Sequence, residues 1–179
     1  MKNEKIVEFA IKEGFADAAI IDTADIVFDA SFRPYCEENL CGWYGANYSC
    51  PPDCGTPEEM KERVQKYKHA LVLRTVWDIN NFKDSTLIKS AKQKHNSYTM
   101  SVIEQMESQG YNGFMVGASG CALCNPCLII EGKPCKFPNK RYSCMSAYCI
   151  YVKDLAEKCG MVYDYKEGAL PFFSMYVYD

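Results

Sequence analysis

The sequence lacks long apolar runs, an excess of basic charge and an export signal. No stretch approaches the roughly 20 apolar residues that a membrane-spanning helix needs. Its 20 Lys and Arg residues against 23 Asp and Glu give a net charge of −3, which is unlike the basic surface of a nucleic-acid-binding protein. The first residues alternate charged with apolar side chains and contain no uninterrupted apolar segment of a signal peptide. We therefore expect a cytoplasmic protein with no membrane and no nucleic-acid partner.

The lack of a phosphate loop and the scarcity of histidine limit the kinds of binding site that the sequence predicts. No glycine-rich phosphate loop follows a predicted strand at the required spacing, so the sequence predicts no nucleotide site. Histidine occurs only twice. His69 opens a predicted strand and His95 lies on the apolar face of a predicted helix, so we assign both to the structure and not to a metal.

The pattern of apolar residues predicts one α/β domain over residues 1–179. Hydrophobic residues make up 48% of the chain, enough for a core without covalent cross-links. Helices alternate with strands, which favours a single-layer mixed sheet flanked by helices, with cysteine-rich loops at about 32–56 and 117–143. Helices are expected at 5–14, from 57 onward, at 85–109 and at 144–159; strands are expected at 18–21, 70–73 and 114–116, with a hairpin of 162–165 and 172–178 turning at 166–168.

Cysteine is the abundant residue type, with 11 copies. Disulfide scaffolds are typical of small secreted domains that cannot build a core, and an odd number of cysteines cannot pair completely. This chain has a predicted core and no export signal. The cysteines therefore indicate metal binding.

The downstream cysteines, Cys121, Cys124, Cys127 and Cys135, are the strongest signal. Three thiolates at two-residue gaps on one loop can converge on a single centre, and a fourth lies nearby. Zinc modules usually space their ligands as two close pairs, so this run favours a 4Fe-4S cluster over zinc. Gly117 and Gly120 precede the run, and glycine lets the main chain approach a cluster and turn with positive φ.

The upstream cysteines, Cys36, Cys41, Cys50 and Cys54, form a second candidate ligand set. Their spacing is irregular, so it does not separate a second cluster from a structural zinc. A cysteine of one loop could also serve the other site. Trp43, Tyr44 and Tyr48 are expected to shield the metal from water. Cys144, Cys149 and Cys159 lie on or beside the predicted last helix, where buried thiols act as small apolar residues; Cys144 or Cys149 could still replace Cys54, the least certain ligand.

Two motifs together resemble a known family. Cys36, Cys41-x-x-Tyr44-Gly45 and Cys50-Pro51-Pro52 come first, followed by Gly120-Cys121-x-x-Cys124-x-x-Cys127 and Cys135-x-Phe137-Pro138. In this order they resemble the predicted metal-binding proteins of domain of unknown function 2284. The resemblance spans nearly the whole chain and implies metal binding in a prokaryotic, often anaerobic setting, with no assigned reaction.

This chain departs from the later part of the family motif, including at both of the motif's carboxylates. The family continues with Pro-Ser-Met-Glu-Ala and Gly-Ile-Asp-Val, where this chain has Ser143 to Ala147 and Cys149 to Val152. Ser146 and Tyr151 stand in place of the two carboxylates. Any reaction that those acids serve in relatives would be lost here, so the resemblance carries no enzymatic prediction.

Three functional hypotheses follow. The leading one is an iron–sulfur protein with one or two 4Fe-4S clusters, serving electron transfer or the reductive support of a partner enzyme. The second is a binding or assembly module stabilised by zinc, without redox chemistry. The third is an enzyme with an open iron site, should one upstream cysteine not be a ligand. A redox or enzyme protein is the expected partner, and the sequence leaves the oligomeric state open.

Overall fold

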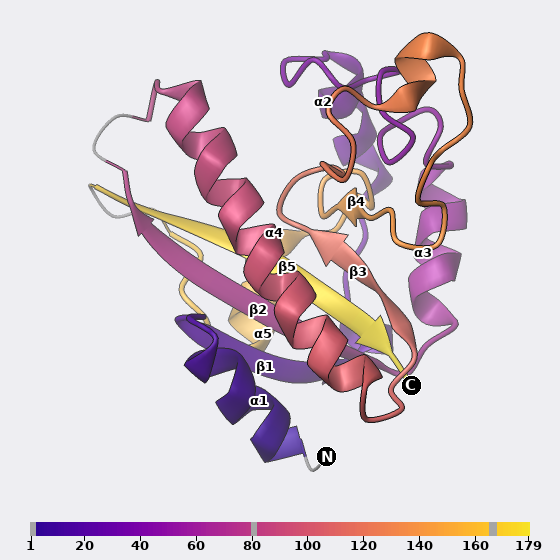
Figure 1. The fold of residues 1–179 in the computed structure, drawn as a ribbon. Coiled ribbons are helices and arrows are strands. Elements are labelled where there is room, and N and C mark those ends of the chain that lie inside the picture. Colours follow the sequence, from indigo (N-terminus) through magenta and orange to yellow (C-terminus); the bar gives the residue numbers. More distant parts are fainter. Residues whose placement is uncertain (1–2, 80–81, 165–167) are drawn as a thin grey trace.

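The computed structural model describes residues 3–79, 82–164 and 168–179. It contains a five-stranded mixed sheet in the order β1-β2-β5-β3-β4 (Figure 1). The strands are β1 (Asp17–Asp22), β2 (His69–Asp78), β3 (Gly113–Gly117), β4 (Ser143–Cys144) and β5 (Ala169–Tyr178). The helices are α1 (Asn3–Lys12), α2 (Arg33–Glu37), α3 (Pro57–Gln65), α4 (Ser85–Glu107) and α5 (Val152–Lys158).

The two long strands β2 and β5 form the centre of the sheet. They pair antiparallel from His69 opposite Tyr178 to Asp78 opposite Ala169. β1 pairs antiparallel with β2, and β3 pairs antiparallel with β5. β3 and β4 are parallel, with Val116 opposite Ser143 and Gly117 opposite Cys144. The carboxyl ends of these two strands therefore meet at the same edge of the sheet.

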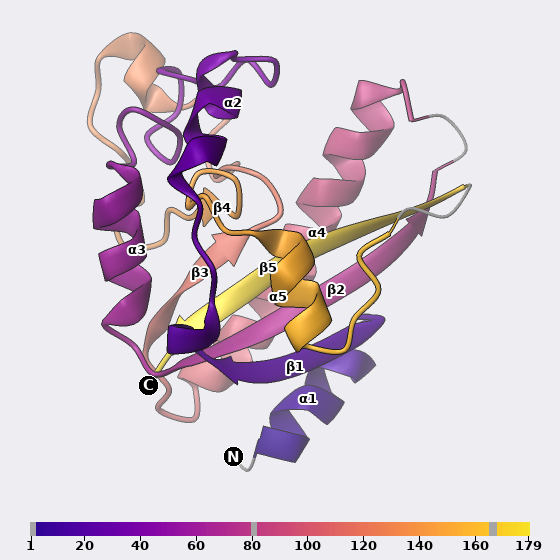
Figure 2. The ribbon, with the colours of Figure 1, turned by 180° about the vertical axis from the view of Figure 1, so that it is seen from behind.

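Helices cover both faces of the sheet (Figures 1 and 2). Successive side chains of a strand point to opposite faces, so β2 divides its residues between two cores. Leu71 and Leu73 pack with α1 and α4, whereas Ala70 and Val72 pack with α3 and α5. Nearly every residue of β5 is buried, as a central strand covered on both faces requires.

Polar residues of α4 form hydrogen bonds with the sheet and with the start of the downstream loop. Thr99 Oγ1 lies 2.7 Å from Ser174 Oγ, and His95 Nδ1 lies 2.7 Å from Thr75 Oγ1. Asn96 accepts a hydrogen bond from the Ala118 amide at 2.8 Å and donates one to Ser119 Oγ at 2.9 Å. α4 thus fixes the chain directly after β3, where the cysteine run begins.

The structure confirms most of the predicted elements and the α/β class. The predicted helices at 5–14, from 57 and at 85–109 correspond to α1, α3 and α4, and the three predicted single strands lie within β1, β2 and β3. Within residues 32–56 the structure adds the short helix α2, which the sequence analysis did not predict. The organisation of residues 1–179 as one domain stays a prediction.

Two predictions near the C-terminus were wrong. The helix expected at 144–159 is restricted to α5, because Cys144 pairs with Gly117 in β4 and Cys149 has a left-handed backbone, with φ of 54°. The expected hairpin does not form, because β5 pairs with β2 and β3 while Val162 to Asp164 are outside any strand. The expected turn was at 166–168, and its first two residues lie outside the described residues.

In the part of the chain that the structure describes, no helix is both long and apolar enough to cross a membrane.

Candidate metal centre

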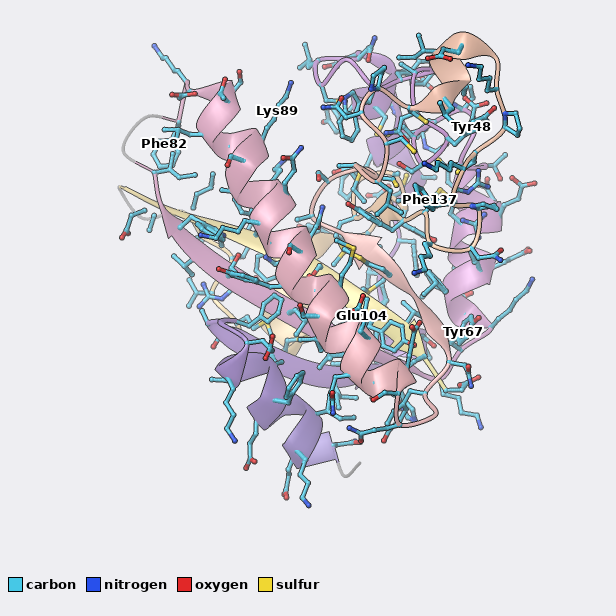
Figure 3. All side chains as sticks on the ribbon, viewed as in Figure 1. Tyr48, Tyr67, Phe82, Lys89, Glu104 and Phe137 are labelled. Carbon is cyan, nitrogen blue, oxygen red and sulfur yellow. The ribbon has the colours of Figure 1, made fainter. Side chains whose placement is uncertain are left out.

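The two cysteine-rich loops lie side by side at one end of the molecule, beyond the carboxyl ends of β3 and β4. Both ribbon views show the purple segment that contains α2 next to the orange segment between β3 and β4 (Figures 1 and 2). Figure 3 shows sulfur atoms gathered in this region, which also holds Tyr48 of the upstream loop and Phe137 of the downstream loop. Two segments about 70 residues apart in sequence thus meet in one place.

Hydrogen bonds join the two loops directly. The Asn47 side-chain amide donates to the Cys121 carbonyl at 2.9 Å, and the Cys121 amide donates to Ser49 Oγ at 2.8 Å. Asn47 and Ser49 are both buried, and the Asn47 amide oxygen accepts from the Ser49 amide and hydroxyl. At the periphery, the Tyr48 hydroxyl donates to the Lys133 carbonyl at 2.9 Å. The upstream loop therefore fixes the position of the first downstream cysteine.

The glycines before the cysteine run are required for close packing. A Cβ atom on Gly120 would lie 2.8 Å from the Trp43 ring and 3.0 Å from Cys50 Sγ. A Cβ atom on Gly117 would lie 2.8 Å from both Ser119 O and the Tyr142 ring. The expected turn with positive φ was wrong, because neither residue has a left-handed backbone. The expected approach of the main chain to a cluster stays a prediction. Gly120 thus places the main chain of one loop against a cysteine sulfur of the other.

The upstream thiols lie in an environment that disfavours their charged form in the metal-free protein. Cys50 and Cys54 are buried, Cys36 is partly buried and Cys41 is exposed. Burial raises the pKa of Cys50 to about 12 and the pKa of Cys36 and Cys54 to about 11. Negative charge on Cys41 raises the pKa of Cys36 and of Cys50, so these thiols lie within electrostatic range of one another.

Cys144 joins the upstream set, a neighbour that the sequence analysis raised only as a possible replacement for Cys54. Cys144 ends β4 and pairs with Gly117 of β3. Gly117 lies three residues before Gly120, whose main chain lies against Cys50 Sγ. Negative charge on Cys144 raises the pKa of Cys36, Cys50 and Cys54. Burial raises the pKa of Cys144 itself. The pairing of β4 with β3 places Cys144 here, so no local sequence signal could have located it.

Arg33 supplies positive charge to this thiol set and links three of its segments. Its guanidinium donates to the Gly55 carbonyl at 2.8 Å and to the Ala147 carbonyl at 2.9 Å. It lies at the start of α2, one turn before Cys36. The positive charge of Arg33 lowers the pKa of Cys36 and Cys54 and so offsets part of the burial effect. The arginine therefore favours the thiolate form that a metal requires.

The downstream thiols are partly buried along a loop with one short helical turn. The 3₁₀ helix Leu128–Glu131 directly follows Cys127 and ends at Gly132, whose φ of 66° turns the chain back toward Cys135. Burial raises the pKa of Cys121, and negative charges on Cys135 and Cys124 raise it further. Cys124 and Cys135 thus lie within electrostatic range of Cys121, and their convergence on one metal stays a prediction. Cys127 stays a predicted ligand.

The donor chemistry fits a thiolate-bound metal, while the arrangement of the side chains does not form a finished site. Among residues 3–79, 82–164 and 168–179, no three Cys, His, Asp or Glu side chains are close enough together to hold a metal ion. All 11 cysteines are free thiols, and the two sets are built from soft sulfur donors suited to iron–sulfur clusters or zinc. Metal binding would need the loops to draw these thiols together.

The two histidines take no part in this region. His95 is fully buried between Phe15 and Phe172, with T-shaped contacts to both rings. His69 lies 3.2 Å from the carboxylate of Asp22 on the neighbouring strand. Their assignment to the structure and not to a metal stays a prediction. The aromatic residues Trp43, Tyr44 and Tyr48 of the upstream loop are partly buried. Their role as a shield for the metal also stays a prediction.

Comparison with known proteins gives one match. The model of a family described as predicted metal-binding protein (DUF2284) matches residues 19–177, which include both cysteine sets and most of the sheet. No curated protein and no solved structure matches the chain significantly.

Proposed function

Since the chain belongs to the DUF2284 family of predicted metal-binding proteins, we propose that it is a cytoplasmic iron–sulfur protein with one or two 4Fe-4S clusters. Cys121, Cys124, Cys127 and Cys135 hold the first cluster. Cys36, Cys41, Cys50 and Cys54 hold the second. The observation that carries the proposal is the convergence of two all-thiol donor sets, joined by the Cys121 hydrogen bonds to Asn47 and Ser49.

The chain around the thiols suits electron transfer to a partner protein. An iron–sulfur cluster supplies one-electron redox chemistry when it is bound. Arg33 offsets the negative charge that the thiolates bring. The ring of Trp43 against Gly120 limits the access of water, and partial exposure of Cys124, Cys127 and Cys135 leaves the downstream set near the surface. A redox or enzyme protein that accepts or supplies electrons is the corresponding partner.

Metal and sulfide content tests the proposal. Protein purified without oxygen should be brown, should contain iron and acid-labile sulfide in equal amounts, and should bleach on reduction with dithionite. As the matched control, the apo-protein should regain the brown colour when it is reconstituted with iron and sulfide, but not when it is given zinc. A colourless protein that holds only stoichiometric zinc contradicts the cluster assignment.

Cysteine variants test the ligand sets. Cys124→Ser removes the central thiolate of the downstream run and should abolish about half of the bound iron when two clusters are present. Cys159→Ser is the control, because this thiol directly follows α5 and packs against the core. Loss of iron in Cys159→Ser but not in Cys124→Ser would refute the assignment. Comparing Cys54→Ser with Cys144→Ser decides which of the two completes the upstream set.

A zinc-stabilised binding or assembly module is the alternative. The observation in its favour is the buried position of Cys50 and Cys54 with Cys144 nearby, because structural zinc sites are closed sets of four donors. Such a module would bind zinc at the upstream set in a one-to-one ratio. It would keep its partner-binding surface under oxidising and reducing conditions alike.

A further inference from the structure

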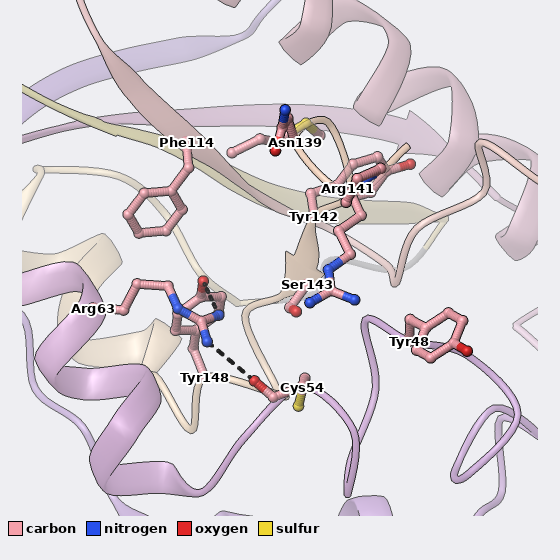
Figure 4. A pocket seen from close by; sticks show the side chains of 11 residues that line it. Tyr48, Cys54, Arg63, Phe114, Asn139, Arg141, Tyr142, Ser143 and Tyr148 are labelled. Carbon is pink, nitrogen blue, oxygen red and sulfur yellow. Dashed lines mark hydrogen bonds between the residues drawn. The ribbon is translucent and has the colours of Figure 1, made fainter. Parts of the chain in front are cut away.

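A cavity of about 330 Å³ lies beside the upstream thiol set, between α3, the ends of β3 and β4, and both cysteine loops (Figure 4). This volume is at the lower end of the range for small-molecule sites. We call it the arginine pocket; the residues that decide its chemistry are Tyr48, Arg63, Phe114, Arg141, Tyr142 and Tyr148.

The charge of the arginine pocket is entirely positive. Arg63 and Arg141 both line it, and none of its lining residues is an Asp or a Glu. Among the described residues, neither arginine forms an ion pair with a carboxylate. Arg63 has only long hydrogen bonds, at 3.4 Å to the Tyr148 hydroxyl and 3.3 Å to the Cys54 carbonyl, drawn in Figure 4. Two guanidinium groups therefore have N–H donors available for an anion.

The geometry of Arg141 suits ligand binding. Its guanidinium carbon lies 5.9 Å from the centre of the Tyr48 ring, within the range of a cation–π contact, and its side chain is exposed. Among the described residues the Arg141 side chain forms no hydrogen bond and no ion pair, so the edge of its guanidinium is open to a ligand. That edge carries the paired N–H groups that bind a carboxylate with two parallel hydrogen bonds. Asn139, also at the pocket, adds an amide that can bind the same group.

Aromatic rings form the walls. Phe114 and Tyr148 stack with ring centres 6.1 Å apart and planes 21° from parallel. Tyr142 and Tyr148 are buried, and Tyr48 is partly buried. Such walls favour a flat apolar body, because aromatic pairs in offset or edge-to-face contact add to the gain from burial. A bare inorganic anion would leave these rings without a contact.

We propose that the arginine pocket binds a small aromatic carboxylate, with its carboxylate on Arg141 and Arg63 and its ring along the aromatic side chains that line the pocket. Because Cys54 also lines the pocket, the ligand lies next to the upstream thiol set. The proposal goes beyond the metal assignment and does not depend on whether iron or zinc occupies the loops. It gives the protein a ligand as well as a metal.

Calorimetric titration of the purified metal-loaded protein with benzoate tests the proposal. Benzoate should bind with a Kd of about 1 mM or lower. Arg141→Gln should weaken binding by about tenfold or more, because a charge-assisted paired contact is lost. Lys140→Gln is the matched control, since it removes a neighbouring exposed positive charge that is not part of the pocket. Arg63→Gln should also weaken binding.

Two further probes separate the parts of the interaction. Benzamide has the same ring without the charge and should bind at least about tenfold more weakly than benzoate. Inorganic phosphate has the charge without the ring and should also bind more weakly. Absence of benzoate binding, equal binding of benzamide or phosphate, or equal affinity in Arg141→Gln and the parent overturns the proposal. Iron content, measured on the same samples, reports separately on the metal assignment.

Discussion

At the scale of single residues, His95 is the clearest case of a polar group placed in the core. Its side chain is fully buried, and Nε2 has no hydrogen-bond partner among the residues that the structure describes. Nδ1 lies 2.7 Å from Thr75 Oγ1, which also accepts a hydrogen bond from the indole N–H of Trp77 at 2.7 Å. The Thr75 hydroxyl can therefore donate its own hydrogen bond to His95 Nδ1. Burial lowers the pKa of His95 to about 3, so the ring is neutral in the folded protein at ordinary pH.

This buried ring predicts a loss of stability in mild acid. An unfolded histidine has a pKa near 6.5, so below that pH the unfolded chain binds a proton that the folded chain does not. The free energy of unfolding should therefore fall as pH decreases from about 6.5 toward 3, by up to roughly 1.4 kcal/mol per pH unit from this residue. Urea unfolding at pH 7 and at pH 5 measures the effect.

The variant His95→Gln should lack this contribution to the pH dependence, whatever its free energy of unfolding at pH 7. Its free energy of unfolding should change less between pH 7 and 5 than that of the parent, by roughly 2 kcal/mol. His69→Gln, at the partly exposed contact with Asp22, removes a histidine outside the core and serves as the control. Equal pH dependence in His95→Gln and the parent would mean that the buried ring is protonated as readily in the fold as in the open chain.

At the scale of elements, the sequence predicts best where the signal is local. Thr56, Pro57 and Glu59 predict the start of α3, and the structure has the complete capping box there. The structure also confirms α4, whose apolar residues recur at helical spacing over 23 residues. Local sequence signals did not predict β4 or the bounds of α5. Residues 144–159 carry helical spacing, but pairing of Cys144 with Gly117 is a non-local contact that outweighs it.

The same distinction holds for the candidate site. Spacing within one tight loop predicts Cys121, Cys124, Cys127 and Cys135 as one ligand set, and that set stays a prediction. Spacing could not bring Cys144 to the upstream set, since that contact depends on the parallel pairing of β3 and β4. The arginine pocket was also missed, because Arg63 and Arg141 belong to segments 78 positions apart in sequence that only the fold brings together.

The capping box of α3 predicts a measurable contribution to stability. Thr56 Oγ1 accepts from the Glu59 amide at 3.2 Å, and the Glu59 carboxylate accepts from the Thr56 amide at 2.8 Å. Thr56→Ala should lower the free energy of unfolding by about 1 kcal/mol in urea unfolding. Lys61→Ala, on the exposed face of the same helix, should change it by less than about 0.5 kcal/mol. Equal effects of the two variants would indicate that the cap adds nothing beyond helix propensity.

At the scale of the whole molecule, stability is divided between a packed body and two loops at one end. Side chains of all five strands and of α1, α3, α4 and α5 form the main cores, whereas α2 contributes no buried residue. Inside the loops, buried positions include polar Asn47 and Ser49 together with Cys50 and Cys54. A segment with little apolar surface gains little from burial to offset the entropy of ordering it. Metal coordination would then supply much of the ordering free energy of the loops.

This division predicts selective opening of the loops when the metal is removed. Chelation under reducing conditions should speed cleavage of the downstream loop by trypsin at Lys136, Lys140 and Arg141. Chymotrypsin should report on the upstream loop, which offers Tyr35, Trp43, Tyr44 and Tyr48 but no Lys or Arg between 34 and 60.

The helix α4 is the internal control for this experiment. Its residues Lys89, Lys92 and Lys94 offer trypsin sites of the same kind within a helix that packs on the sheet. Cleavage there should stay slow with and without metal, because a cut requires opening of the packed body. Mass spectrometry of the fragments separates the two regions, and re-addition of the metal should restore protection of the loops. Loop cleavage at one rate in the loaded and the chelated protein would show that the inter-loop hydrogen bonds of Asn47, Tyr48 and Ser49 hold this end of the molecule together without metal.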